Sequence, residues 1–218
     1  MSQRSETVVV IDDDASVCEA LRGLFESVGL LTRTYGSVQA FLATEPPEGS
    51  CCVVLDIRLP GQSGLEFQEA LARSGSPQAV ILISGHVDVQ MAVRAMKAGA
   101  VDVLAKPVRE QDLLEAVNRA IKQAAKRRRD IERMAALQAR HALLTDRERQ
   151  VMALVTAGLL NKQIAERVSI AEATVKLHRG QVMRKMGAES VPELVRMADF
   201  LGQEGGHESG DAGPLGPQ

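Results

Sequence analysis

The chain has 218 residues, enough for one or two domains of ordinary size, and 45% of them are hydrophobic. The net charge of −2 hides an uneven distribution, because residues 1–122 carry −5, residues 123–201 carry +6 and residues 202–218 carry −3. Only four consecutive apolar residues, 8–11, follow the polar N-terminus, which argues against a secretory signal or a membrane span, so we expect a cytoplasmic protein. The cysteines at 18, 51 and 52 lack metal-ligand spacing and are expected to be buried free thiols.

The first half of the chain alternates short apolar segments with helical patterns. Val17, Leu21, Leu24 and Val28 recur at helical spacing and predict the first helix, which Gly29 would end. Three apolar segments are nearly continuous, as is typical of parallel strands covered on both faces. Five strands alternating with five helices predict a doubly wound, five-stranded parallel α/β sheet. The expected strands are residues 7–11, 30–35, 52–55, 79–83 and 100–104, and further helices are Gly64–Arg73, Val89–Lys97 and one from Asp112 onward.

The helix expected from Asp112 has no stop signal, because neither proline nor glycine occurs between Val108 and Gly158. We therefore predict a long helix that joins two domains and could self-associate. The expected boundaries are a first domain at 1–122, a helical linker at 123–142, a second, all-α domain at 143–201 and a disordered tail at 202–218.

The second domain is expected to hold four short helices, over residues 145–157, 161–168, 172–186 and 192–201. Thr145 with Glu148 fits a capping box, Gly158 suits a helix end and Asn161 suits an N-cap. Two of these helices joined by a tight turn, the second with polar residues on its free face, match the geometry of a helix-turn-helix module.

Polar side chains follow four of the expected strands at the point where each strand ends. Asp12 and Asp13 follow the first strand, Asp56 the third, Ser84 the fourth and Lys106 the fifth. Because the carboxyl ends of parallel strands meet at one edge of a sheet, we expect these side chains to converge. Clustered carboxylates are stabilised by a cation, and Mg²⁺ with its oxygen ligands fits. A carboxylate beside Mg²⁺, with a lysine and a hydroxyl nearby, can attack a phosphoryl donor and form an aspartyl phosphate.

The stretches that carry these residues resemble the CheY-like receiver domain of two-component response regulators. They are VVIDDD at 9–14, LDIRLPG at 55–61, LISGH at 82–86 and AVDVLAKP at 100–107, and residues 85–100 resemble the FixJ subgroup in particular. The resemblance implies a flavodoxin-like fold in which Asp56 accepts a phosphoryl group from a sensor histidine kinase. It also implies Asp13 and Asp56 as direct Mg²⁺ ligands, Asp12 acting through water, and the backbone carbonyl of Arg58 as a further ligand.

The same resemblance implies that Ser84 and Lys106 contact the phosphoryl group and that the Lys106–Pro107 peptide bond is cis. One position departs from the family pattern, because Val103 stands where an aromatic residue usually changes rotamer on phosphorylation. We therefore expect the signal to pass through Ser84 and the backbone of the neighbouring loops and helix. Valine is also simply a good strand residue, and this plainer interpretation stays open.

A second set of stretches resembles the LuxR/GerE-type helix-turn-helix module. They are LTDRERQV at 144–151, GLLNKQIA at 158–165, TVKLHR at 174–179 and KMG at 185–187. The resemblance implies that the helix beginning near Glu172 enters the major groove of double-stranded DNA, with Lys176 and Leu177 facing base edges. Four residues would hold phosphates instead, namely Asn161, Thr174, Arg179 and Lys185. Two departures are Gly180, where a contacting side chain is common, and Ala171, which replaces a serine cap.

The function that these expectations support is that of a transcription regulator, not an enzyme, which forms a homodimer when phosphorylated; RNA polymerase stays open as a further partner. One alternative is a haloacid-dehalogenase-type phosphatase, in which Asp12 is the nucleophile and Asp14 the acid/base. This reading leaves Asp56 and the second half of the chain unexplained. Another alternative is a regulator that works without phosphorylation.

Overall fold

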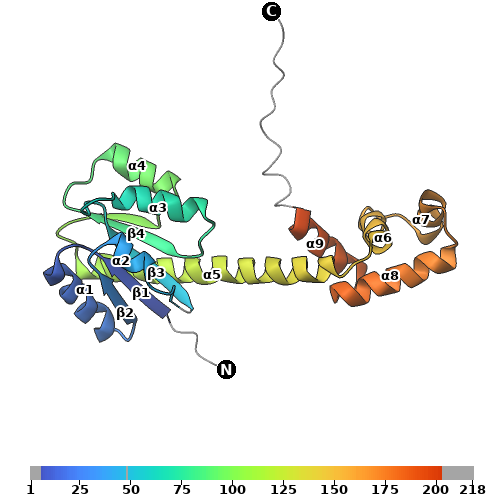
Figure 1. Ribbon diagram of the computed structural model, residues 1–218, viewed down its shortest axis with the longest axis horizontal. Coiled ribbons are helices and arrows are strands. Elements are labelled where there is room, and N and C mark those ends of the chain that lie inside the picture. The colour runs from blue at the N-terminus through green and yellow to red at the C-terminus, as the bar shows by residue number, and fades with distance from the viewer. Residues whose placement is uncertain (1–5, 48, 203–218) are drawn as a thin grey trace, which may run out of the picture. The chain divides into compact units, whose positions relative to one another are not determined.

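The computed structural model describes residues 6–47 and 49–202. These residues divide into two compact units, one ending at Asp130 and the other beginning at Ile131. The first unit is built from strands and helices and the second from helices (Figure 1). Among the described residues, no helix has both the length and the apolar character that crossing a bilayer requires. The tail expected at 202–218 lies outside this range, except for Gly202, which is the last residue of a helix.

The described part of the first unit contains a five-stranded sheet in which all strands are parallel, in the order β2-β1-β3-β4-β5. This confirms the predicted doubly wound fold. The strands are β1 (Glu6–Ile11), β2 (Leu31–Tyr35), β3 (Ser50–Asp56), β4 (Ala79–Ser84) and β5 (Asp102–Ala105). The helices are α1 (Ala15–Ser27), α2 (Val38–Leu42), α3 (Gly64–Arg73), α4 (Val89–Lys97) and the first part of α5 (Glu110–Ala142).

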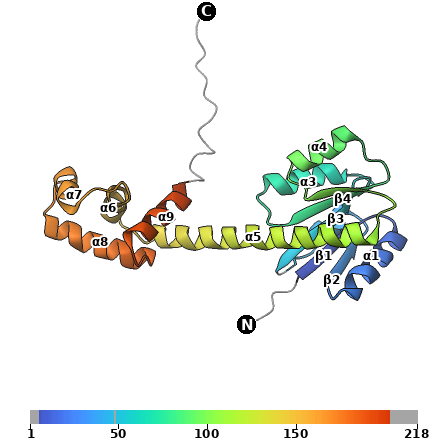
Figure 2. The ribbon, with the colours of Figure 1, turned by 180° about the vertical axis from the view of Figure 1, so that it is seen from behind.

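Helices cover both faces of the sheet, and alternate residues of each strand pack against opposite helices. On β3, Cys52 and Val54 join the cluster made with α1 and α5, whereas Val53 and Leu55 join the cluster made with α2, α3 and α4. Figure 2 shows α5 crossing the first of these faces. Strand β1 lies between β2 and β3, so the chain adds β2 on one side of β1 and then β3, β4 and β5 on the other. This change of direction places a crevice beyond the carboxyl ends of β1 and β3.

Two details of the first unit differ from the sequence-based expectations. Strand β5 begins at Asp102 and not at residue 100, because the backbone N–H of Ala100 donates to the carbonyl of Ala95 and closes α4. The short helix α2 has no clear helical pattern in the sequence, since only two of its side chains, Val38 and Phe41, are buried. It is anchored by Ser37, whose side chain accepts from the N–H of Ala40.

The second unit packs four further helices around one aliphatic core. They are α6 (Asp146–Thr156), α7 (Asn161–Val168), α8 (Glu172–Met186) and α9 (Val191–Gly202). The buried side chain of Leu137 shows that the end of α5 also packs in this core. The capping box of Thr145 and Glu148 is confirmed. The N-cap predicted at Asn161 is wrong, because α7 already begins there and the Gln163 side chain accepts from the N–H of Leu160.

All three cysteines are buried and unpaired, as expected. Burial raises the pKa of the Cys51 thiol to about 12, and it also raises the pKa of the Cys52 thiol well above its ordinary value. Burial is also the main cause of the raised pKa of Cys18, whose thiol donates to the carbonyl of Asp12. These thiols therefore stay protonated at neutral pH and serve as small apolar side chains.

Candidate functional site

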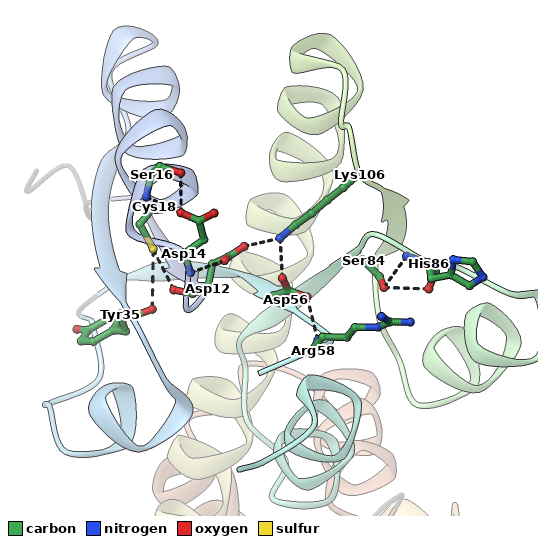
Figure 3. A network of polar contacts seen from close by, with 10 residues as sticks. All are labelled: Asp12, Asp14, Ser16, Cys18, Tyr35, Asp56, Arg58, Ser84, His86 and Lys106. Carbon is green, nitrogen blue, oxygen red and sulfur yellow. Dashed lines mark hydrogen bonds and ion pairs between the residues drawn. The ribbon is translucent and has the colours of Figure 1, made fainter. Parts of the chain in front are cut away.

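The crevice at the carboxyl edge of the sheet holds a cluster of charged side chains (Figure 3). Asp12 and Asp13 follow the last residue of β1, and Asp56 is the last residue of β3. Lys106 follows β5 and reaches back over the sheet to the carboxylates. Parallel pairing of β1 with β3 sets the two strand ends side by side. The structure therefore brings together four of the residues that the sequence singled out.

The lysine ammonium bridges two buried carboxylates. Lys106 Nζ lies 2.7 Å from Asp12 Oδ2 and 2.6 Å from Asp56 Oδ2. Asp12 is only 3% exposed and Asp56 8%, whereas Asp13 is exposed to solvent. One carboxylate oxygen from each of Asp12, Asp13 and Asp56 can be chosen so that all three lie within 4.8 Å of one another. Three oxygens at this spacing fit a hard divalent cation, which also takes water ligands.

Charge and burial act in opposite directions on Lys106. Partial burial lowers its pKa, but the hydrogen bonds and the charges of Asp12 and Asp56 together outweigh burial, so the pKa is raised above its ordinary value. The ammonium therefore stays charged at neutral pH. It can compensate the negative charge of the carboxylates or of an anionic group bound to one of them.

Backbone groups orient the two buried carboxylates. The N–H of Arg58 donates to Asp56 Oδ1 at 2.9 Å, and the N–H of Asp14 donates to Asp12 Oδ1 at the same distance. Gly64 lies so close to Asp56 that a Cβ atom would stand 2.1 Å from the Asp56 carbonyl oxygen. The loop after β3 therefore folds tightly around Asp56, and only glycine fits at its far end.

Ser84 ends β4 at the same edge of the sheet and is fully buried. Its hydroxyl donates to the carbonyl of His86 at 2.9 Å and accepts from the N–H of His86 at 3.2 Å. Within the described part of the chain the Ser84 hydroxyl is hydrogen-bonded to neither Asp56 nor Lys106, although the backbone N–H of Lys106 donates to the Ser84 carbonyl at 2.8 Å. A hydroxyl can rotate to a new acceptor, so Ser84 can exchange its bond to the loop for one to a group on Asp56. The Lys106–Pro107 peptide bond is cis, as expected.

The second unit presents a helix-turn-helix made of α7 and α8. Three residues separate the two helices, and Ser169 takes the left-handed conformation at φ 53° in this turn. Helix α8 buries one side in the core and exposes the other, which carries Leu177 and Lys176, the latter 3.9 Å from the exposed carboxylate of Glu172. Leu177 is 61% exposed, which is unusual for a leucine unless a partner covers it. This exposed side is completed by Ala173, Gly180 and Arg184.

Three of the four residues expected to hold phosphates are engaged inside the second unit. Arg179 on α8 donates to the side-chain oxygen of Asn161, the first residue of α7, at 3.0 Å. Lys185 lies 2.6 Å from a carboxylate oxygen of Glu148, which is buried, and also donates to the carbonyl of Leu143. The capping box located Glu148, but no local pattern could reveal a lysine partner 37 positions away. Thr174, partly buried, lies near the start of α8.

The fold and its acidic edge define the first unit as a receiver domain, and the second unit is a helix-turn-helix module. Residues 8–118 match the family described as response regulator receiver domain, and residues 142–198 match the bacterial regulatory proteins of the luxR family. The chain belongs to the two-component response regulators that join a receiver to a LuxR-type DNA-binding domain, the FixJ subgroup. This family is regulatory rather than enzymatic.

Relatives match over nearly the whole chain. Nodulation protein W of Bradyrhizobium diazoefficiens is 46% identical over 92% of this chain and 88% of its own length. Transcriptional regulatory protein FixJ of Azorhizobium caulinodans is 44% identical over 89% of this chain and 92% of its own length. The solved structure of the response regulator StyR superposes with a TM-score of 0.79 at 43% identity, covering 89% of this chain and 98% of its own. Full-length FixJ from B. japonicum superposes with a TM-score of 0.52 at 38% identity, covering 93% of this chain and 99% of its own.

The phosphatase alternative does not survive these findings. Its acid/base candidate, Asp14, caps α1 by accepting from the N–H of Ser16 at 2.8 Å, and Figure 3 shows its carboxylate turned towards Ser16. A helix-capping aspartate accounts fully for this position. The family match over both halves of the chain instead explains Asp56 and the helix-turn-helix together.

Proposed function

We propose that Asp56 accepts a phosphoryl group from a sensor histidine kinase and that this modification controls dimerisation and DNA binding. The observation that carries the proposal is the cluster of three carboxylates within 4.8 Å, two of them bridged by the Lys106 ammonium. Mg²⁺ would be held directly by Asp13, Asp56 and the Arg58 carbonyl, with Asp12 acting through water, and would neutralise the oxygens of the transferred group.

The proposed transfer forms one bond and breaks one. An oxygen of Asp56 attacks the phosphorus of a phosphohistidine, the phosphorus–nitrogen bond breaks, and the electron pair stays on the imidazole, which takes up a proton. Each Asp56 oxygen keeps a free lone pair beside its present hydrogen bond, so both can react. Lys106 has a third N–H, beyond the two bonded to carboxylates, for the phosphoryl oxygens.

The signal would leave the site through Ser84. When its hydroxyl turns to the phosphoryl group, the bond to the His86 carbonyl is lost and the loop between β4 and α4 is released. Val103 is partly buried against the core cluster that α4 joins, and it has no aromatic ring that could change rotamer. Helix α4 exposes Val89, Val93 and Met96, which lie on one face at helical spacing. This apolar face is suited to pairing with a second copy of the chain.

Pairing would present two copies of α8 to double-stranded DNA. Lys176 would face guanine acceptors and Leu177 a thymine methyl in the major groove. Thr174, together with Asn161 and Arg179 as one bonded pair, would hold phosphates. Lys185, already bonded to Glu148 and Leu143, keeps one N–H for a phosphate.

The proposal is tested by treating the full chain and its Asp56→Asn variant with a small phosphoryl donor and Mg²⁺. We expect mass-spectrometric peptide mapping to find the label on Asp56, and sedimentation to show a dimer in the wild-type sample only. DNA affinity should rise in parallel. Label on Asp12, or an unchanged mass and DNA affinity after labelling of Asp56, would contradict the proposal.

A further inference from the structure

Three cations form a stripe on the solvent side of α5, within the first unit. Lys122, Lys126 and Arg129 are all exposed. At 3.6 residues per turn, their spacing places them within about 60° of one another around the helix and spreads them over about 10.5 Å of its axis. The opposite side of the same helix is buried in the receiver core through Ala120, Ile121 and Ala124.

The three side chains of the stripe make no polar contact that stabilises the described part of the first unit. None of the three forms a hydrogen bond or an ion pair with another described residue, whereas the arginines between them do. Arg127 donates to the carbonyl of Gln78 and Arg128 to that of Gly49, so these two guanidinium groups pin α5 to loops of the receiver. Within this basic segment, Arg127 and Arg128 therefore hold the fold together, whereas the three stripe cations are unpaired among the described residues.

Carboxylates border only the C-terminal end of this stripe. Asp130 is four residues after Lys126 and Glu132 is three after Arg129, whereas the nearest acidic residue on the N-terminal side of the same face, Glu115, is about 10.5 Å before Lys122 along the axis. Like charges on one face repel, and residues 123–142 carry a net charge of +4. Such an arrangement is stabilised when an anionic partner lies against it.

We propose that this stripe of Lys122, Lys126 and Arg129 binds the phosphate backbone of duplex DNA outside the stretch read by α8. The three cations are strung along the helix and do not converge on one point, so they suit a polyanion better than a single phosphate. Duplex DNA carries one negative charge per about 1.7 Å of its axis. The inference rests on the proposed DNA binding by α8, because the stripe adds no base recognition of its own.

Two features favour DNA over an anionic membrane surface. A helix that lies in a membrane interface inserts an apolar face, but the apolar face of α5 is occupied by the receiver core. Arg129 also lies only two residues before the second unit, which carries the helix-turn-helix. A duplex bound by α8 is therefore bound by the same chain that carries the stripe.

The experiment compares the full chain with a Lys122→Gln/Lys126→Gln/Arg129→Gln variant. Glutamine keeps the helix propensity and removes the charge. The matched control is Arg33→Gln/Arg73→Gln/Arg109→Gln, which removes three exposed cations elsewhere on the same unit. Each protein is titrated with a 40-base-pair random-sequence duplex across a range of salt concentrations, and with vesicles of anionic lipid.

Each phosphate contact contributes about 0.9 to the slope of log affinity against log salt, so losing three should reduce the steepness by about 2.7. Between 50 and 200 mM salt, the fall in affinity should then be about 40-fold smaller than for the wild type, and the control should keep the wild-type slope. An unchanged slope in the stripe variant, an equal loss in the control, or a loss confined to vesicle binding would overturn the proposal. Failure of the wild type to bind duplex DNA would instead refute the proposed function itself.

Discussion

Replacing Lys185 with methionine should destabilise the second unit, and not merely weaken its contact with DNA. The ammonium group of Lys185 lies 2.6 Å from the carboxylate of Glu148, whose side chain is only 6% exposed. Methionine keeps most of the aliphatic stem but leaves this carboxylate with the N–H group of Thr145, its partner in the capping box. The substitution therefore leaves a nearly buried negative charge without its counter-ion.

The size of the effect follows from the exposure of the two partners. Removing one partner of a fully buried ion pair costs about 3–5 kcal/mol. The Lys185 side chain is 29% exposed and Glu148 keeps its capping bonds, so we expect about 2 kcal/mol. For a unit of this size, the melting temperature should fall by about 8–16 °C.

The assay is thermal unfolding of a fragment spanning residues 131–218, followed by circular dichroism, with the variants Lys185→Met, Glu148→Gln and the double substitution. The double variant should recover part of the stability lost in Lys185→Met, because neutral glutamine no longer leaves a charge unpaired. DNA affinity is measured on the same proteins well below their melting temperatures. An unchanged melting temperature combined with weaker DNA binding would refute the reasoning and assign Lys185 to phosphate contact alone.

Ala171→Ser should raise the melting temperature of the second unit by about 4–8 °C, because Ala171 occupies the N-cap of α8 in extended geometry without a side-chain cap, and a serine cap is worth about 1 kcal/mol. Gly64→Ala should lower receiver stability and slow labelling of Asp56 by a phosphoryl donor, since its Cβ would overlap the Asp56 carbonyl; equal labelling rates would show that the loop relaxes freely. Hydrogen bonds from Lys185 and Thr145 lower the pKa of Glu148 from 4.5 to about 2. Its contribution to stability is therefore complete above about pH 4.5 and declines as the pH falls towards 2, which acid unfolding of wild type and Glu148→Gln should reveal.

The sheet and its acidic edge could be predicted because both depend on local patterns and one topological rule. Continuous apolar runs marked the buried strands, and parallel strands bring their carboxyl ends to one edge. The convergence of Asp12, Asp56 and Lys106 can therefore be predicted without knowing any distance between them. Ser84 was placed at the same edge for the same reason, but its bond to the His86 backbone depends on the path of a loop that no periodicity describes.

The state of the cations in the second unit could not be predicted in the same way. Lys176 and Lys185 look alike in the sequence, yet the first is 67% exposed at its side chain and lies 3.9 Å from the exposed Glu172 on its own helix, whereas the second is bonded to the buried Glu148. The difference arises from packing of α8 against α6, which brings together residues far apart in the chain. Asn161 was mistaken for a cap because its residue type suits that position, whereas the structure uses its side chain as an acceptor for Arg179.

The burial of Cys18, Cys51 and Cys52 makes the native chain a convenient background for site-directed labelling. Alkylating reagents react with thiolates, and these thiols are both shielded and held in the neutral form. A single cysteine introduced at an exposed position, such as Leu177, would therefore be the preferred target of a fluorophore or spin label. Movements of either unit could then be followed in solution without first removing the native cysteines.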